Sequence, residues 1–144
     1  MIDGVLLFPL RTIPGDQGMV LHMLRSDAAH FTRFGEAYFS TVNPHAVKAW
    51  KRHRRMEQNL AVPVGKVRFV IYDDREGSPT RGTVAAIDIG ESRYALLRIP
   101  AGLWYGFSGL SVTPALIANC PDLPHDPTEM DRLPADDPSI PYRW

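Results

Sequence analysis

Short apolar runs, separated by residues that favour turns, make up most of the chain. Gly, Pro, Asn and Asp bound nearly every run, and each run has the length of a β-strand. No long segment repeats apolar residues every 3.6 positions, so amphipathic helices are not expected. Many short strands with regular turns predict an all-β sandwich, barrel or jelly roll. The predicted strands are Val5–Leu10, Met19–Leu24, Ala37–Val42, Val47–His53, Gln58–Val62, Lys66–Tyr72, Thr83–Ile89, Tyr94–Ile99, Trp104–Phe107 and Pro114–Asn119.

Two segments depart from this pattern. Asp27–Phe34 is expected to form one helical turn, with its aspartate as the N-cap. Residues 120–144 hold six of the thirteen prolines and six acidic residues against two arginines, a composition that is common in disordered tails. Because this tail ends in Ile140, Tyr142 and Trp144, we expect it instead to be ordered and to pack on the barrel.

Length and composition limit the number of domains and the kinds of partner that the chain can have. A chain of 144 residues has the size of one domain with a single core, here residues 1–144. Sixteen Lys and Arg balance sixteen Asp and Glu, so no overall field attracts nucleic acid. The one cysteine, Cys120, allows no internal disulfide and fits a reducing compartment. Neither a leader pattern nor an apolar run of about 20 residues is present. We therefore expect a cytoplasmic protein that binds neither nucleic acid nor membranes.

Positive charge is concentrated in one run, from Lys48 to Arg55, where six of eight residues carry or can carry it. A tryptophan interrupts the run and an apolar strand follows it directly, which is unusual for a solvated surface turn. Side chains two apart on a strand share a face, so Lys51, His53, Arg55 and Glu57 can point into one cavity. This face is the candidate site.

Three stretches carry a resemblance to a known family: PVGKV, YDDREGSPTRGTVAAIDIGESRYALLRIPAGLWYGF and DDPSIPYRW. Their Ser-Pro-Thr-x-Gly turn, Ile-Pro-x-Gly-x-x-x-Gly-Phe turn and terminal Asp-Pro…Trp pattern resemble the dTDP-4-dehydrorhamnose 3,5-epimerase family over most of residues 5–144. The resemblance implies a cupin-type jelly roll (a double-stranded β-helix barrel), a homodimer, a nucleotide-linked sugar as ligand and no cofactor. It also implies proton abstraction alpha to the C4 ketone of the sugar, by a His that an Asp orients, with a Lys near the enolate and a Tyr as acid.

Several catalytic positions of the family hold other residues here. The family's His aligns with Lys51, its enolate Lys with Gln58 and its Tyr with Ile117. His53 stands two residues beyond the family's base, and Asp137 matches the aspartate that orients that base. We therefore predict that His53 is the general base and that Asp137 is its partner. The alternative is that His53 only lines the cavity mouth and that Asp137 forms a salt bridge of the tail.

The other site residues follow from the same alignment. Lys51 is expected to stabilise an enolate or a bound diphosphate; it would be the base if burial lowered its pKa. Tyr105 replaces the His of the family's second turn and is a candidate for the acid, acting from the opposite side of the cavity. The alternative is that this tyrosine only packs in the core or at the rim of the barrel. On an ideal strand the Lys48 side chain points to the face opposite that of Lys51. Lys48 can therefore bind the substrate only if the strand contains a bulge or if Lys48 lies at the strand end. The predicted substrate-binding residues are Lys48, Arg55, Gln58 and Arg98.

A metal and nucleic acid are the competing ligands. Of the pattern that metal-binding cupins use, only His53 and Glu57 are present, too few for a typical site, so no metal is expected. The run KAWKRHRR would also suit nucleic acid, but in a neutral chain the phosphates of a nucleotide-linked sugar are the better partner.

Two function classes remain. The first is an isomerase, a nucleotide-sugar epimerase that moves protons alpha to a ketone. A base two residues further along the strand is displaced by about 6.6 Å, which favours inversion of one carbon over two. The second class is a non-catalytic or repurposed cupin that binds a nucleotide-linked sugar or a related phosphorylated ligand.

Overall fold

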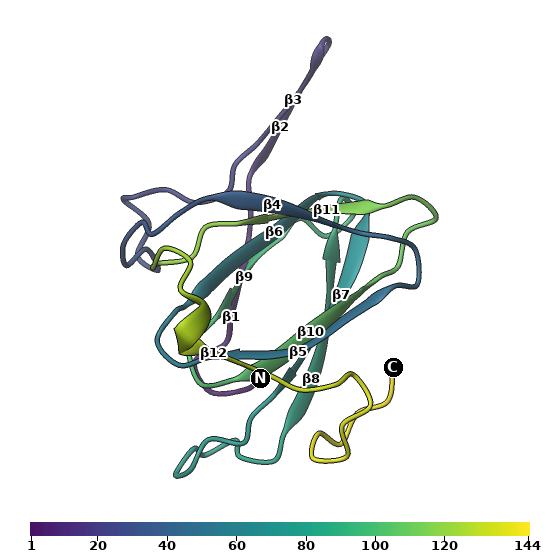
Figure 1. Ribbon diagram of the computed structural model, residues 1–144. Coiled ribbons are helices and arrows are strands. Elements are labelled where there is room, and N and C mark those ends of the chain that lie inside the picture. The colour runs from purple at the N-terminus through teal and green to yellow at the C-terminus, as the bar shows by residue number, and fades with distance from the viewer.

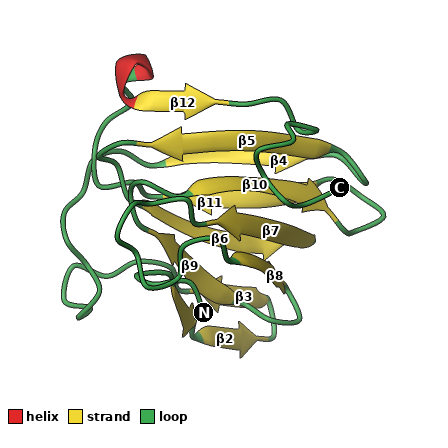
Figure 2. Ribbon diagram, turned by 90° about the horizontal axis from the view of Figure 1, so that it is seen from below, coloured by secondary structure: helices red, strands yellow, loops and turns green.

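The computed structural model describes residues 1–144 as two five-stranded sheets that face each other, with a separate hairpin (Figure 1). The first sheet has the order β1-β9-β6-β11-β4 and the second has the order β12-β5-β10-β7-β8. Every pair of neighbouring strands is antiparallel. The prediction of an all-β jelly roll is confirmed, since the one helical element is a three-residue 3₁₀ turn beside β12 (Figure 2). The elements are β1 (Leu6–Pro9), β2 (Thr12–Gly15), β3 (Gly18–Leu21), β4 (Tyr38–Val42), β5 (Val47–His53), β6 (Gln58–Val64), β7 (Lys66–Tyr72), β8 (Val84–Gly90), β9 (Ala95–Ile99), β10 (Trp104–Gly109), β11 (Ala115–Asn119), η1 (Pro127–Glu129) and β12 (Met130–Arg132).

Strands β5 and β7 begin and end where the sequence predicts. Two strands were not predicted. β2 contains Pro14, which indicates a turn, but the missing N–H is tolerated because β2 pairs only with β3. β12 is only three residues long and follows a proline-rich segment.

The predicted helical turn at Asp27–Phe34 is wrong. This segment forms successive turns, in which the backbone N–H of Ala28 donates to Arg25 and that of Phe31 donates to Ala28. The Asp27 carboxylate does not cap a helix but accepts two hydrogen bonds from the Arg25 guanidinium. A side chain that can pair with a neighbouring arginine has less to gain from an N-cap role.

The main core fills the space between the sheets. On β7, Val67, Phe69 and Ile71 are fully buried in this core, while Val70 between them belongs to a different cluster on the outer face. The period of two residues per repeat therefore places both faces of β7 against apolar groups. This double burial explains why β7 is a nearly continuous apolar run in the sequence.

The outer cluster joins the C-terminal segment to the second sheet. Trp50, Val70, Trp104 and Ile140 are all buried there, and Trp144 packs against the Trp50 ring with the centroids 5.1 Å apart. The Trp50 indole Nε1 also donates to the Ala135 carbonyl oxygen at 3.2 Å. Strand β5 is thus covered on its outer face by the last residues of the chain.

A register shift in β5 sets which of its side chains face inward. Lys51 lies opposite Tyr105 on β10, whereas Lys48 lies opposite Phe107, so three steps on β5 match two steps on β10. Lys48 can share a face with Lys51 only if the strand contains such a bulge, and the bulge is present. Gly106 stands at this point because a Cβ there would lie 2.4 Å from the Cβ of Ala49.

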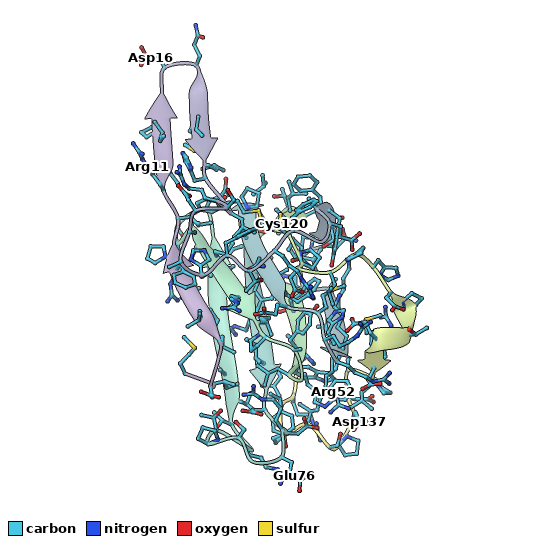
Figure 3. The ribbon with its side chains drawn as sticks, turned by 90° about the vertical axis from the view of Figure 1, so that its left-hand side faces the viewer. Arg11, Asp16, Arg52, Glu76, Cys120 and Asp137 are labelled. Carbon is cyan, nitrogen blue, oxygen red and sulfur yellow. The ribbon has the colours of Figure 1, made fainter.

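The β2–β3 hairpin projects away from the two sheets, with Arg11 near its base and Asp16 at its tip (Figure 3). Its side chains are largely exposed, and Met19 and Val20 retain 62% and 55% of their accessible surface. No helix of the chain is long and apolar enough to cross a membrane.

Ile140→Ala should lower the free energy of unfolding by about 2–5 kcal/mol, the usual cost of removing a fully buried aliphatic side chain. Ile140 is 0% exposed in the outer cluster, so its loss leaves a cavity against Trp50. Urea denaturation measures the change, and Val112→Ala, at a position 95% exposed, is the matched control. Equal stability of the two variants would mean that the C-terminal segment contributes nothing to the fold.

Candidate active site

A groove runs along the inner face of β5, between this strand and residues of β4 in the other sheet. It consists of two adjoining hollows of about 310 Å³ and 340 Å³ that share Lys51 and Arg132. The first hollow extends to Lys48 and Ser40, and the second extends to His53. A larger hollow of about 620 Å³ lies along the hairpin, but only residues 13–20 line it, and they include no histidine, lysine or arginine. The groove is therefore the candidate active site.

Three cations line the groove without a carboxylate partner: Lys48, Lys51 and Arg132. The Lys51 ammonium lies 5.4 Å from the centroid of the Tyr105 ring. The Lys48 ammonium donates to the Thr41 carbonyl oxygen of β4 at 2.6 Å, so it bridges the two sheets at one end of the groove. Unpaired cations in a partly buried groove favour an anionic ligand.

The arginines of the basic run lie outside the groove, and carboxylates neutralise them. Arg52 pairs with Asp74 and Asp131, and its guanidinium lies 4.5 Å from the centroid of the Trp104 ring on the outer face. Arg54 also pairs with Asp131. The run thus divides into an outward part that closes ion pairs and an inward part that keeps its charge free.

The Lys51 ammonium has a lowered pKa. Burial lowers the pKa to about 8, and the positive charges of Arg132 and Lys48 add to this effect. Most Lys51 side chains remain protonated at pH 7, which suits the stabilisation of negative charge. A bound anion would raise this pKa again and favour the charged form.

His53 is held by Glu129 rather than by Asp137. The Nδ1 atom of His53 makes a short hydrogen bond with one Glu129 oxygen, and both side chains are buried. The other Glu129 oxygen accepts the backbone N–H groups of Arg55 and Met56 at 3.0 Å and 3.2 Å. These bonds fix the carboxylate from two sides.

The turn η1 brings Glu129 to this position. Asp126 caps the turn by accepting the backbone N–H of Thr128 at 2.9 Å, and Pro127 begins it. Strand β12 then pairs with β5, with Met130 opposite His53 and Arg132 opposite Lys51. The segment that carries the carboxylate is therefore in register with the strand that carries the imidazole.

The pKa values of this pair favour a neutral imidazole beside an ionised carboxylate. Burial lowers the pKa of His53 below its ordinary value, and the hydrogen bond and charge of Glu129 offset only part of the change. Burial raises the pKa of Glu129, but the hydrogen bonds from His53 and from the two backbone N–H groups outweigh it and leave the pKa lowered. An ionised carboxylate can only accept, so Nδ1 carries the hydrogen and Nε2 presents a lone pair. This is the state that a general base requires.

The predicted place of Asp137 beside His53 is wrong. Asp137 is exposed in the C-terminal segment, and its carboxylate accepts the backbone N–H of Ser139 at 2.9 Å and its hydroxyl at 2.5 Å (Figure 3). The aspartate serves a local turn instead of the site. Glu129, from a different element, takes the position beside the imidazole.

The predicted place of Tyr105 on the opposite side of the cavity is also wrong. β10 is the neighbour of β5 in the same sheet, so Tyr105 and His53 project from one wall. The Tyr105 hydroxyl lies 3.5 Å from Nε2 of His53, and the side chain is only 2% exposed. Burial raises the pKa of this hydroxyl well above its ordinary value, which keeps it neutral beside the imidazole.

Three of the predicted substrate-binding residues do not line the groove. Arg55 is exposed and pairs with Asp126. Arg98 pairs with Glu57, which removes Glu57 from the face assigned to it. Gln58 is buried, and its Oε1 accepts a hydrogen bond from Asn119 at 2.6 Å. Lys48 is the one predicted substrate-binding residue that lies in the groove.

Among the residues not predicted are Tyr38 and Arg132, which line the groove, and Glu129, which is buried against His53. The segment from Asp126 to Glu129 has the Asp-x-x-Glu spacing of a helical N-terminus, a signal that could have marked the turn. Nothing local indicates that this turn lies against β5. No group of three or more His, Cys, Asp or Glu side chains is placed to hold a metal ion.

Comparisons with known proteins identify the family. A sequence model of the dTDP-4-dehydrorhamnose 3,5-epimerase family matches residues 1–144. The chain belongs to this family. The resemblance noted in the sequence is therefore confirmed.

The relatives agree with the assignment. The crystal structure of a dTDP sugar isomerase from Desulfovibrio desulfuricans G20 is 53% identical and superposes with a TM-score of 0.97, covering 99% of this chain and 92% of that one. The spore coat polysaccharide biosynthesis protein SpsL of Bacillus subtilis is 33% identical over 100% of this chain and 97% of its own length. The probable low-salt glycan biosynthesis epimerase Agl13 of Haloferax volcanii is 36% identical, with 99% and 94% covered. The cupin-type jelly roll of the epimerase family is thus the fold of this chain.

Glu129→Gln should lower the pKa of His53 further, because the carboxylate charge that raises it is lost. NMR titration of the histidine ring signals measures this change, and His53→Gln identifies the signal. Asp137→Asn is the matched control and should leave the titration unchanged. A changed His53 pKa in the Asp137 variant, with none in the Glu129 variant, would make Asp137 the partner of His53.

Proposed function

We propose that the protein is a nucleotide-sugar epimerase that acts on a nucleotide-linked 4-keto sugar. One observation supports this most strongly: a neutral His53, unprotonated at Nε2 and held by an ionised Glu129, stands in a groove lined by unpaired cations. The family and the dTDP sugar isomerase that is 53% identical supply the ligand class.

The chemistry follows from this arrangement. Nε2 of His53 removes a proton from a carbon next to the C4 ketone, and negative charge passes to the ketone oxygen as the enolate forms. Lys51, protonated at pH 7 and adjacent on the inner face, stabilises this charge. Lys48 and Arg132 extend the positive potential along the groove and bind the diphosphate.

The removed proton must be replaced from the other face of the carbon for inversion to occur. His53 lies two residues beyond Lys51, the position that aligns with the family's base. A displacement of about 6.6 Å along the strand brings the base to a different part of the sugar ring. We therefore propose that one carbon is inverted rather than two.

The alternative function is binding of a nucleotide-linked sugar without catalysis. Replacement of the family's catalytic residues at Lys51, Gln58 and Ile117 originally favoured it. The His53–Glu129 pair provides a different base, and the curated relatives are named for polysaccharide and glycan biosynthesis, one of them as an epimerase. These observations favour the epimerase.

Incubation with a dTDP-linked 4-keto-6-deoxyhexose in deuterated water should place deuterium at a carbon next to the ketone, followed by NMR. His53→Gln should slow this exchange by about 10² or more, the usual contribution of a general base, while dTDP still binds. Binding without exchange in the parent protein would support the non-catalytic alternative. Normal exchange in His53→Gln together with none in Lys51→Met would make Lys51 the base.

We also propose a homodimer that uses the projecting hairpin. An exposed pair of apolar side chains, Met19 and Val20, on an arm clear of the core is suited to contact with a second copy. A nucleotide-linked ligand, the single cysteine and the absence of a charge excess support a cytoplasmic location without nucleic-acid or membrane partners. No cofactor is needed for proton transfer alpha to a ketone, and none is proposed.

Light scattering at micromolar concentration should give the mass of a dimer. Met19→Glu combined with Val20→Glu should shift the protein to the monomer, because two charges cannot be buried in an apolar contact without a large desolvation cost. Val112→Glu, at an exposed loop position, should remain dimeric. A monomeric parent protein would refute the dimer without affecting the fold.

A further inference from the structure

Tyr38 stands on the wall of the groove opposite His53. It is the first residue of β4, in the first sheet, whereas His53 is the last residue of β5, in the second. Both side chains line the same hollow of about 340 Å³, together with Lys51. Facing sheets of a sandwich lie about 10 Å apart, so a sugar ring bound between them has one wall on each face.

A chain of hydrogen bonds fixes the direction in which the Tyr38 hydroxyl can donate. The backbone N–H of Asn59 donates to Oδ1 of Asn119 at 3.2 Å, which determines how the Asn119 amide is oriented. The Nδ2 group of Asn119 then donates to Oε1 of Gln58 at 2.6 Å and to the Tyr38 hydroxyl oxygen at 2.8 Å. Both hydrogens of Nδ2 are used in these two bonds.

The Tyr38 oxygen is thus an acceptor within the protein, and its own hydrogen has no partner there. A hydroxyl that already accepts from Asn119 must turn its hydrogen elsewhere, and Tyr38 borders the groove. The wall opposite His53 therefore presents the Tyr38 hydroxyl as a hydrogen-bond donor.

We propose that Tyr38 is the acid of the reaction, delivering a proton to the substrate carbon from the face opposite His53, and that Asn119 is the residue that positions it. This inference rests on the proposed epimerase function. His53 takes the original hydrogen as a proton, and the electron pair of the broken C–H bond enters the enolate. That pair then forms a new C–H bond with the Tyr38 hydrogen, leaving a phenolate and an imidazolium. Water in the groove returns one proton to the phenolate and accepts one from the imidazolium.

The surroundings of Tyr38 fit this role. Burial raises the pKa of its hydroxyl, and the hydrogen bond from Asn119 lowers it in part. The Asn119 N–H group continues to donate to the oxygen after the proton has left, and such a bond is stronger to a phenolate than to a phenol. Tyr105 lacks the geometry for the same step, because it projects from the wall that carries His53 and would return a proton to the original face.

Tyr38→Phe separates proton removal from inversion. With a dTDP-linked 4-keto-6-deoxyhexose in deuterated water, this variant should still exchange the hydrogen through His53 but with retained configuration. Formation of the inverted sugar should fall by about 10² or more, the usual contribution of a general acid. Tyr94→Phe, at a position away from the groove, is the matched control and should invert as the parent does.

Asn119→Asp tests the positioning role while Tyr38 remains in place. The new carboxylate can still accept the Asn59 N–H, but it would also accept the Tyr38 hydrogen and turn it away from the groove. Inversion should therefore fall relative to exchange, as in Tyr38→Phe, which a general loss of stability would not cause.

Three results would overturn the inference. Normal inversion by Tyr38→Phe would refute it and leave the epimerase function intact. Loss of inversion with retained exchange in Tyr105→Phe, but not in Tyr38→Phe, would assign the acid to Tyr105. Absence of exchange in the parent protein would refute the epimerase function and this inference together.

Discussion

The two faces of β5 are the constraint on which the rest of the structure depends. Its outer face carries Trp50 into an apolar cluster, and its inner face carries Lys51 and His53 into the groove. The bulge opposite Gly106 makes this possible, because it inserts one residue and brings Lys48 to the same face as Lys51. A strand that anchors itself by a buried tryptophan can hold charged side chains rigidly on its other side.

The groove is positively charged because its cations lack carboxylate partners, and not because the chain carries an excess of basic residues. The chain as a whole is neutral, and the arginines of the basic run have carboxylate neighbours. Lys48, Lys51 and Arg132 have none, so a local positive potential remains where the strands open. The two lysines belong to the basic run on β5, but the third cation comes from β12, far away in the sequence.

The sequence predicted the fold well because strand patterns are local. Alternation and turn residues located β5 and β7, and the family motifs in the turns identified the jelly roll. The sequence also predicted that His53 shares a face with Lys51, and both line the groove. The partner of His53 was not predicted, because Glu129 is 76 positions away and reaches the imidazole through a short turn and a three-residue strand. Alignment with the family favoured Asp137 as the partner of His53. The Asp137 carboxylate instead accepts hydrogen bonds from Ser139 within a local turn.

The distance in sequence between His53 and Glu129 has a consequence for the order in which the site folds. Strand β5 can pair with β10 without β12, whereas the carboxylate that holds the imidazole lies 76 positions away, just before β12. Pairings between distant segments form late because a long loop must close first. We therefore expect the imidazole to gain its carboxylate only after most of the second sheet has formed. The site would then be among the last parts of the barrel to assemble during folding.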